Sequence, residues 1–355
     1  MSTAPSVRVT ADSPTPPPRW DARAVEVPGG HVMQSATWGT YRASQGWDAH
    51  FLTFDDERVV LALLRSAAGL PGSEAIVRRG PAHVHETPQS SAARAAALAS
   101  WAREAGARTL YLDPERPADP AYAEAMDSAG FEVTDDLEPS IHVMRRDFEP
   151  GLDDEALLRS FSKSTRQRIR AAEKAGVTVD PSTDPEQLRA FAELLHERAD
   201  VVGMQLQAGT GFVEAWRRLI DADLGQLLLA EHEGELVGGL FLFRQGGIWS
   251  TAYSADKASM RRELPGTMHL VRWTAIRAAF DEGCPGIELG GVDLPGHREP
   301  PQQGDPNRGL YEHKRGFGAE WVEREPARRI VLRPGAERLA LVRRRVIDGL
   351  RGMRR

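Results

Sequence analysis

The sequence of 355 residues contains a single cysteine, Cys284. One thiol cannot form a disulfide within the chain, which excludes a disulfide-stapled fold and favours a reducing compartment. No apolar run reaches the roughly 20 residues needed to span a bilayer. The segment from Met1 to Trp20 also lacks the apolar core of a secretory signal. We therefore expect a cytoplasmic protein.

Several motifs of cofactor and metal chemistry are missing as well. The sequence has no Walker A loop and no GxGxxG fingerprint. His196-Glu197 is not followed by a second histidine at the spacing of a zinc-binding helix. Cys284 falls in a helix-to-strand turn, where a packed thiol is commoner than a nucleophile. We predict neither a metal nor a bound cofactor.

Length and composition are those of a soluble globular protein of about two domains, with 41% hydrophobic and 27% charged residues. The net charge of -6 speaks against a nucleic-acid partner for the molecule as a whole. Basic residues nevertheless gather locally, and such clusters can meet phosphate or an anionic membrane face; a solvated helix face is the plainer alternative for each. The clustered residues are Lys163, Arg166, Arg168, Arg170 and Lys174, then Arg328, Arg329, Arg333, Arg338, Arg343, Arg344, Arg345, Arg351, Arg354 and Arg355.

The order of predicted elements repeats itself. Residues 1–24, rich in Pro, Ser and Thr, are predicted to be disordered. Each half then shows paired strands, a helix, a strand that ends at Asp113 or at Gly290-Gly291, a loop, a second helix and a further strand. The repetition indicates a duplicated α/β unit, with mixed sheets flanked by helices. This is the order of the acetyltransferase-like (GNAT) fold.

One stretch carries the clearest chemistry. A strand from Ile287 to Leu289 stops at Gly290-Gly291, and a polar loop leads to a helical piece in which Tyr311, Lys314 and Arg315 share one face. Gly316 is predicted to end that helix. The pattern places cations beside a strand end, which suits an anionic ligand or a developing oxyanion. A solvated basic face is the alternative.

Five segments in order resemble the Fem family of peptidoglycan-bridge aminoacyltransferases. The signature-like segment runs from Phe161 to Val177 (FSKSTRQRIRAAEKAGV). The other four are Gln34 to Arg42 (QSATWGTYR), Tyr111 to Pro114 (YLDP), Ala252 to Ala255 (AYSA) and Gly309 to Gly318 (GLYEHKRGFG). The resemblance covers nearly all of the chain after about Val27.

The resemblance implies two tandem GNAT-like domains without the coiled-coil arm of some members. Domain 1 would span 25–148 and be completed by the C-terminal tail 326–355, and domain 2 would span 149–325. The implied reaction transfers Gly, Ala or Ser from aminoacyl-tRNA, a co-substrate, to the side-chain amine of a peptidoglycan stem peptide. The acceptor would be lipid II or UDP-MurNAc-pentapeptide. We expect a monomer that can touch the inner membrane face.

The resemblance also assigns roles to residues. Lys314 would stabilise the tetrahedral oxyanion, and Asp113 would hold the attacking amine; its alternative is a turn cap before Pro114. The remaining assignments concern substrate binding. Arg42 and Arg198 would bind acceptor phosphate, Tyr253 would line the acceptor cavity, Tyr311 or Phe317 would stack on the terminal adenosine, and Lys163, Arg166, Arg170 and Lys174 would bind tRNA. A core position is the alternative for Phe317.

Three other functions stay open. An acyl-CoA N-acyltransferase would need a pyrophosphate loop at a helix N-terminus, and the segment from Arg262 to Met268 does not fit its spacing. A tRNA-dependent aminoacyltransferase of a peptide natural product would use the same chemistry on another acceptor. A non-catalytic tRNA- or membrane-binding protein would keep the arginines but would not need Asp113 and Lys314 at two strand ends.

Overall fold

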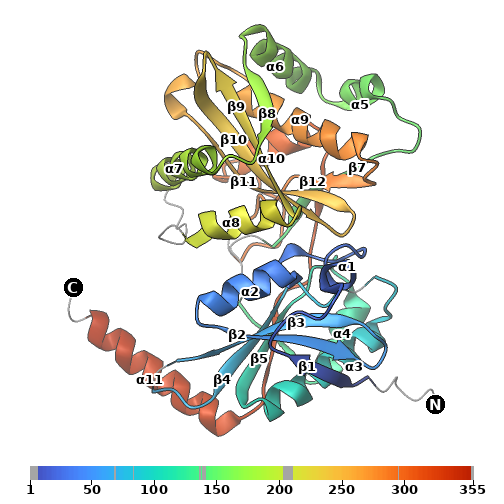
Figure 1. The fold of residues 1–355 in the computed structure, drawn as a ribbon, viewed down its shortest axis with the longest axis vertical. Coiled ribbons are helices and arrows are strands. Elements are labelled where there is room, and N and C mark those ends of the chain that lie inside the picture. Colours follow the sequence, from blue (N-terminus) through green and yellow to red (C-terminus); the bar gives the residue numbers. More distant parts are fainter. Residues whose placement is uncertain are drawn as a thin grey trace. The chain divides into compact units, whose positions relative to one another are not determined.

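The computed structural model describes residues 7–67, 69–82, 84–135, 137, 141–202, 211–294 and 296–352, without the side chains of 198–202, 211–212 and 344–352. The chain divides into two compact units. Unit 1 is Met1–Glu138 together with Arg324–Arg355, and unit 2 is Pro139–Glu323. Each unit is a sheet flanked by helices (Figure 1).

The sheet of unit 1 has the strand order β1-β2-β3-β4-β5-β14-β6, with β4 and β5 parallel and the other neighbours antiparallel. Trp20 packs on Phe51 on one face, whereas Leu52, pointing the other way, joins the core under α3 and α4. Helices therefore cover both faces. The strands are β1 (Val9–Ser13), β2 (Asp48–Phe54), β3 (Val59–Ser66), β4 (Ser73–Arg78), β5 (Ala107–Asp113), β6 (Glu132–Val133) and β14 (Arg328–Val331). The helices are α1 (Trp20–Ala24), η1 (Val32–Gln34), α2 (Ala36–Ser44), α3 (Pro88–Glu104), α4 (Pro120–Ser128) and α11 (Pro334–Gly352).

The sheet of unit 2 has the order β8-β9-β10-β11-β12-β7-β13, with β11 and β12 parallel. Side chains of α5, α6 and α9 form one core cluster, whereas Phe191 and Trp216 of α7 and α8 pack with Phe241 outside that cluster. The strands are β7 (Val143–Asp147), β8 (Thr178–Ser182), β9 (Gly225–His232), β10 (Glu235–Gln245), β11 (Ile248–Asp256), β12 (Gly286–Glu288) and β13 (Glu320–Val322). The helices are α5 (Asp154–Ser160), α6 (Lys163–Lys174), α7 (Pro185–Val202), α8 (Gly211–Asp221), η2 (Ala258–Met260), α9 (Thr267–Asp281) and α10 (Arg308–Arg315).

The two strand orders match position by position. β5 and β12 are equivalent, each lying beside a parallel partner, and α3 and α9 are equivalent crossovers that precede them. In each sheet, the strand next to β5 or β12 on the far side comes from a distant part of the chain. In unit 1 this strand is β14, which follows unit 2 in the sequence. In unit 2 it is β7, which precedes the other strands of that unit. The fold is thus a duplicated mixed α/β sheet.

Two sequence predictions need correction. Residues 7–24 are ordered rather than disordered, because β1 pairs with β2 and Trp20 is only 2% exposed; residues 1–6 lie outside the described residues. The strand β7, which we assigned to the first domain, pairs with β12 and β13 in the second sheet. The observed division therefore falls near residue 138 instead of 148.

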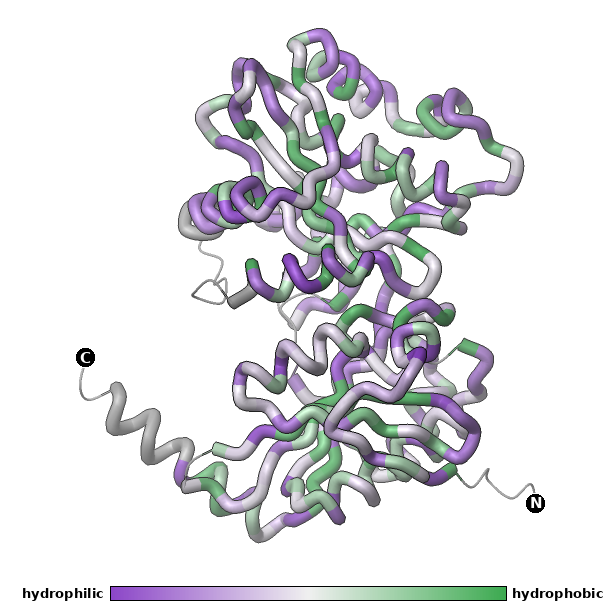
Figure 2. The backbone as a smooth tube through the Cα atoms, viewed as in Figure 1, coloured by the Kyte–Doolittle hydropathy of each residue, from purple (hydrophilic) through white to green (hydrophobic). Residues whose placement is uncertain are grey.

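Apolar residues line the sheets, as the green tube along β3 shows in Figure 2. The same view shows α6 as mostly hydrophilic, with Ile169 and Ala172 as its buried side. Over the described residues, no helix combines the length and apolar composition that crossing a bilayer requires.

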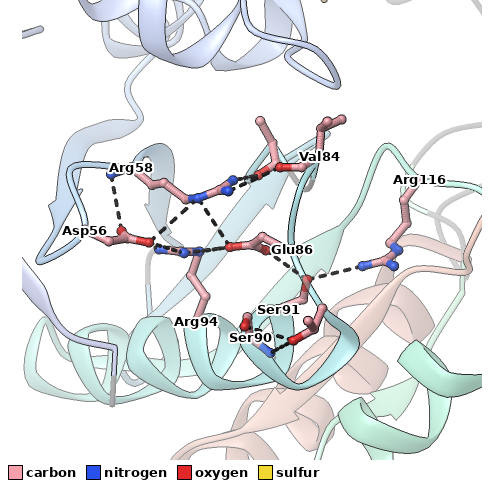
Figure 3. A network of polar contacts seen from close by, with 10 residues as sticks. Asp56, Arg58, Val84, Glu86, Ser90, Ser91, Arg94 and Arg116 are labelled. Carbon is pink, nitrogen blue, oxygen red and sulfur yellow. Dashed lines mark hydrogen bonds and ion pairs between the residues drawn. The ribbon is translucent and has the colours of Figure 1, made fainter. Parts of the chain in front are cut away.

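Unit 1 contains a dense network of charged side chains around the buried Arg94 (Figure 3). Arg94 of α3 is 2% exposed and donates to both carboxylate oxygens of Asp56, at 3.1 and 2.7 Å. Its Nε also donates to Glu86 at 2.7 Å, and Ser91 and Arg58 contact the same carboxylate. Arg94 therefore joins the β2–β3 turn, the segment before α3 and α3 itself.

Candidate functional site

Lys314 lies at the end of β12, where α10 packs against the strand-end glycines. Its side chain is 3% exposed, and Nζ donates to the carbonyl oxygen of Gly291 at 2.7 Å. Gly290 has φ 73°, and a Cβ there would lie 2.8 Å from the Thr251 carbonyl and 3.5 Å from Nζ. A larger residue would be strained and crowded. The two glycines therefore let the strand end approach the amine.

The pKa of Lys314 lies well below its usual range. Burial is the largest cause, the nearby Arg272 guanidinium lowers it further, and Asp293 acts in the opposite direction. The Asp293 carboxylate is held by the backbone amides of Ile141 and His142, at 2.9 and 3.4 Å. An amine in this setting releases a proton more readily than a surface lysine, and when protonated it can donate to an oxyanion.

Arg272 is a second buried cation of this unit. It projects from α9, is 4% exposed, and lies with Nη2 3.5 Å from the Ser254 hydroxyl. Burial lowers its pKa to about 10, so it remains cationic at neutral pH. Across the described ranges, no carboxylate lies within ion-pair distance of Lys314 or Arg272. The pair creates a positive potential that an anionic group can neutralise.

Two histidines pack beside these cations. Nδ1 of His313 lies 3.1 Å from Nε2 of His269, so one imidazole donates to the other. Burial, followed by Arg168 and Arg272, lowers the pKa of His269 to about 4. Burial also lowers the pKa of His313, with Arg272 as the next cause. Both rings are therefore neutral at pH 7. We call Lys314, Arg272, His269, His313 and Asp293 the Lys314 site.

The other candidate site residues on α10 and just after it, Tyr311, Arg315 and Phe317, do not share the surroundings of Lys314. Arg315 points to solvent and lies 3.7 Å from Glu312, so the predicted shared face with Lys314 is wrong. Tyr311 is half-buried, with the Arg308 guanidinium 5.0 Å from its ring centroid. Phe317 is fully buried against Phe161 and the two histidines, which favours the core alternative over base stacking.

Gly316 follows the last residue of α10 as predicted, but a glycine is needed there for a different reason. Its φ is -59°, a right-handed value, so it is not a left-handed cap. A Cβ at this position would lie 2.3 Å from the Thr165 hydroxyl of α6. The glycine is required because α10 and α6 approach closely.

The segment predicted to bind tRNA forms α6, with Ser162 as its N-cap accepting from the Thr165 amide at 3.2 Å. Lys163, Arg170 and Lys174 are exposed. Arg166 instead donates to backbone carbonyls just before the helix, including that of Arg159 at 2.9 Å. Three of the four predicted phosphate contacts therefore lie on a solvent-facing surface.

Asp113 is the last residue of β5 and is 1% exposed. Its Oδ2 lies 3.4 Å from Nε of Arg79, which also binds Glu115 at 2.9 Å. Burial acts to raise the pKa of Glu115, but Arg324 and Arg79 lower it to about 2. Asp113 is thus part of a buried ion network in unit 1, whereas Lys314 lies in unit 2.

The remaining predicted acceptor residues are spread over both units. Arg42 lies in the last turn of α2, with its guanidinium 4.6 Å from the Trp47 ring centroid. Tyr253 of β11 packs against Trp216 at 4.9 Å. Arg198 lies in α7, and its side chain falls outside the described residues.

Sequence reasoning missed Arg272 and the histidine pair. His313 stood inside the motif that singled out Lys314, but His269 lies 44 residues away on another helix. Arg272 lies in an apolar helix, and a charged residue on a buried helix was the one signal available.

Comparison with known proteins agrees with this architecture. Residues 159–315 match the family model of an acetyltransferase (GNAT) domain. The chain is similar to the crystal structure of FemX, with TM-score 0.78 and 18% identity over 93% of this chain and 99% of that chain. A conserved protein of unknown function from Bacteroides thetaiotaomicron VPI-5482 is also similar, with TM-score 0.51 and 12% identity over 82% and 88%. No curated protein matches the sequence.

These likenesses agree with the predicted fold class, two tandem GNAT-like domains with mixed sheets flanked by helices. The domain match supports a transferase of the GNAT class.

Proposed function

We propose that the protein is a tRNA-dependent aminoacyltransferase. It adds Gly, Ala or Ser to the side-chain amine of a peptidoglycan stem peptide, carried on lipid II or UDP-MurNAc-pentapeptide. The five Fem-like segments, the likeness to FemX and the acetyltransferase domain match support the proposal. The observation that carries it is the Lys314 site, where a buried amine and a buried guanidinium lie together without a carboxylate within ion-pair distance among the described residues.

The chemistry asks little of the protein beyond alignment and charge stabilisation. The acceptor amine attacks the ester carbonyl of aminoacyl-tRNA and a C–N bond forms. The carbonyl oxygen becomes an oxyanion, which Lys314 and Arg272 stabilise. The ester C–O bond then breaks, the tRNA ribose hydroxyl leaves with a proton, and the amine loses one. The neutral imidazoles of His269 and His313 keep the site free of further positive charge.

Substrate binding is assigned to the residues outside this site. The exposed side chains of Lys163, Arg170 and Lys174 on α6 bind tRNA phosphates. Arg42 and Arg198 bind acceptor phosphate. Asp113, 1% exposed and 3.4 Å from Arg79, keeps its place in the ion network of unit 1 and takes no part in binding the amine. Tyr253 lines the acceptor cavity, and Tyr311 stacks on the terminal adenosine.

An acyl-CoA transferase is the second candidate, because the matching domain model is that of an acetyltransferase. The helix that would bind pyrophosphate is α9, whose N-cap is Gly266. A Cβ on Gly266 would lie 2.1 Å from the backbone carbonyl of Arg168, so α6 packs directly on this helix end. A carbonyl oxygen is a poor neighbour for pyrophosphate, which favours the tRNA-dependent reaction.

A transfer assay tests the proposal. Purified protein is incubated with labelled Gly-, Ala- or Ser-tRNA and either lipid II or UDP-MurNAc-pentapeptide, with RNase-treated tRNA as the control and acetyl-CoA as a separate donor. We expect RNase-sensitive labelling of one acceptor. Acetyl transfer without any labelling from tRNA would replace this proposal with the acyl-CoA alternative.

A further inference from the structure

The C-terminal helix α11 is anchored to unit 1 along one side. Glu337, in its first turn, is 6% exposed and accepts from Nε of Arg108 at 3.0 Å. Ala340, one turn later, is 2% exposed. Just before the helix, Arg333 donates to the carbonyl of Arg103 at 2.9 Å. The start of α11 is therefore fixed on the sheet, with Glu337 and Ala340 facing inward.

The opposite side of the same turns is apolar and open to solvent. Leu339 and Val342 on that side are 45% and 58% exposed, and Leu341, on the flank nearer Glu337, is 43% exposed. Over the described part of the chain the other exposed large hydrophobic residues are Val133, at 57%, and Leu310, at 38%. Leu339 and Val342, three residues apart, form a stripe that lies roughly opposite Glu337 and Ala340 at 3.6 residues per turn. Unit 1 does not cover this stripe.

Positive charge flanks the stripe. Arg338 and Arg343 are exposed next to Leu339 and Val342. The sequence from 338 to 355 carries seven arginines and one acidic residue, Asp348, in a chain whose net charge is -6. An apolar stripe between arginines is typical of helices that lie in the plane of an anionic lipid interface, with aliphatic side chains among the acyl chains and guanidinium groups at lipid phosphates.

We propose that α11 binds the surface of membranes rich in anionic phospholipid and holds unit 1 there. Two other occupants fit less well. A second copy of the chain would bring two arginine-rich helices together, which repel one another. RNA would meet the arginines but leave the aliphatic stripe in water, since its bases stack on aromatic side chains. The proposal stands independently of the aminoacyl transfer proposed above.

Vesicle co-sedimentation of the full chain tests this surface. The vesicles contain phosphatidylglycerol with phosphatidylcholine, or phosphatidylcholine alone, at physiological ionic strength. We expect binding to the anionic vesicles only. Leu339→Glu with Val342→Glu, and separately Arg338→Glu with Arg343→Glu, should each lower the partition coefficient by about tenfold or more. All four side chains are exposed, so thermal melting should confirm that the variants fold.

The matched control reverses two exposed charges elsewhere, Arg170→Glu with Lys174→Glu on α6, and should leave vesicle binding unchanged. Equal binding to both kinds of vesicle, or binding unaffected by the α11 variants, would overturn the proposal. The proposal would also be overturned if the protein did not bind vesicles and instead formed a concentration-dependent dimer that Leu339→Glu with Val342→Glu abolished. Binding of the protein to immobilised tRNA, without binding to vesicles, would overturn the proposal and indicate that α11 binds RNA.

Discussion

The equivalent strands β5 and β12 have different functional groups at their ends. β5 ends at Asp113, whose carboxylate lies in a network with Arg79 and Glu115. The chain after β12 passes through Gly290 and Gly291, where the Lys314 amine contacts backbone. The scaffold is the same, so the difference comes from the side chains around each strand end: Asp113 is the last residue of β5, whereas α10 supplies Lys314 to the glycines that follow β12.

The contrast extends to the buried cations of the two units. In unit 1, Arg94 binds Asp56 and Glu86, and Arg108 binds Glu74 and Glu337 at 2.7 and 3.0 Å. In unit 2, the described surroundings of Lys314 and Arg272 offer a carbonyl and a hydroxyl instead. A buried charge in an ion pair stabilises the fold, whereas a buried cation with no carboxylate within ion-pair distance suits a site that binds an anion.

The largest expected effect on stability comes from removing a buried arginine that forms ion pairs. Arg94→Met should lower the free energy of unfolding by about 3–5 kcal/mol, because the buried side chain of Glu86 would lose its main partner. Arg272→Met should change the free energy of unfolding by less than about 1 kcal/mol or raise it, because it removes a buried charge that has no carboxylate within ion-pair distance. Urea denaturation of both variants measures this, and equal losses would break the comparison.

Lys314→Met should separate activity from stability. We expect kcat/KM for the proposed transfer to fall by about 10²–10³-fold, the loss typical of removing one oxyanion donor. The thermal midpoint should stay the same or rise, because burial of the amine disfavours its charged form. The control is Lys257→Met, an exposed lysine of the same unit that pairs with Glu235. A fully active Lys314→Met would remove Lys314 from the mechanism.

The starts of the equivalent helices α3 and α9 offer a smaller contrast. Thr87 caps α3 by accepting from the Ser90 amide at 3.1 Å, so Thr87→Ala should cost about 1 kcal/mol. Gly266 starts α9 at φ 101°, with α6 backbone against it. Gly266→Ala should cost about 2 kcal/mol or more from backbone strain and displacement of α6. Differential scanning calorimetry should rank the two variants in this order, and the reverse order would contradict the assigned packing.

Acid should lower the stability of both units through two histidines, the buried His31 of unit 1 and the half-buried His269 of unit 2. The pKa of His269 is lowered to about 4 and that of His31 to about 3, burial being the largest cause for each. The unfolded chain therefore binds more protons below pH 6.5, so stability falls as the pH drops toward these values. His269 should contribute about 1–3 kcal/mol of the loss, levelling off near pH 4. His269→Gln should flatten that part of a stability–pH curve, and an unchanged curve would argue against a neutral buried ring.

The sequence predicted the features that depend on local pattern. Alternating strands, stopping glycines and the α10 segment placed Lys314 beside a strand end, as the structure confirms. It failed where partners distant in the chain decide the outcome. β1 is ordered only because β2 pairs with it, and His269 meets His313 across two helices. The inward turn of Phe317 likewise depends on Phe161, far away in the sequence.

The late position of β14 has a consequence for synthesis on the ribosome. Unit 2 is continuous, and its last strand has been made by residue 322. β5 and β6 of unit 1 have been made by residue 133, but β14, which lies between them, is finished only at residue 331. Protease treatment of nascent chains arrested before and after that residue would reveal when unit 1 becomes protected. The amino-terminal unit is thus the last to complete its sheet, and until then β5 presents an open edge to any neighbouring strand.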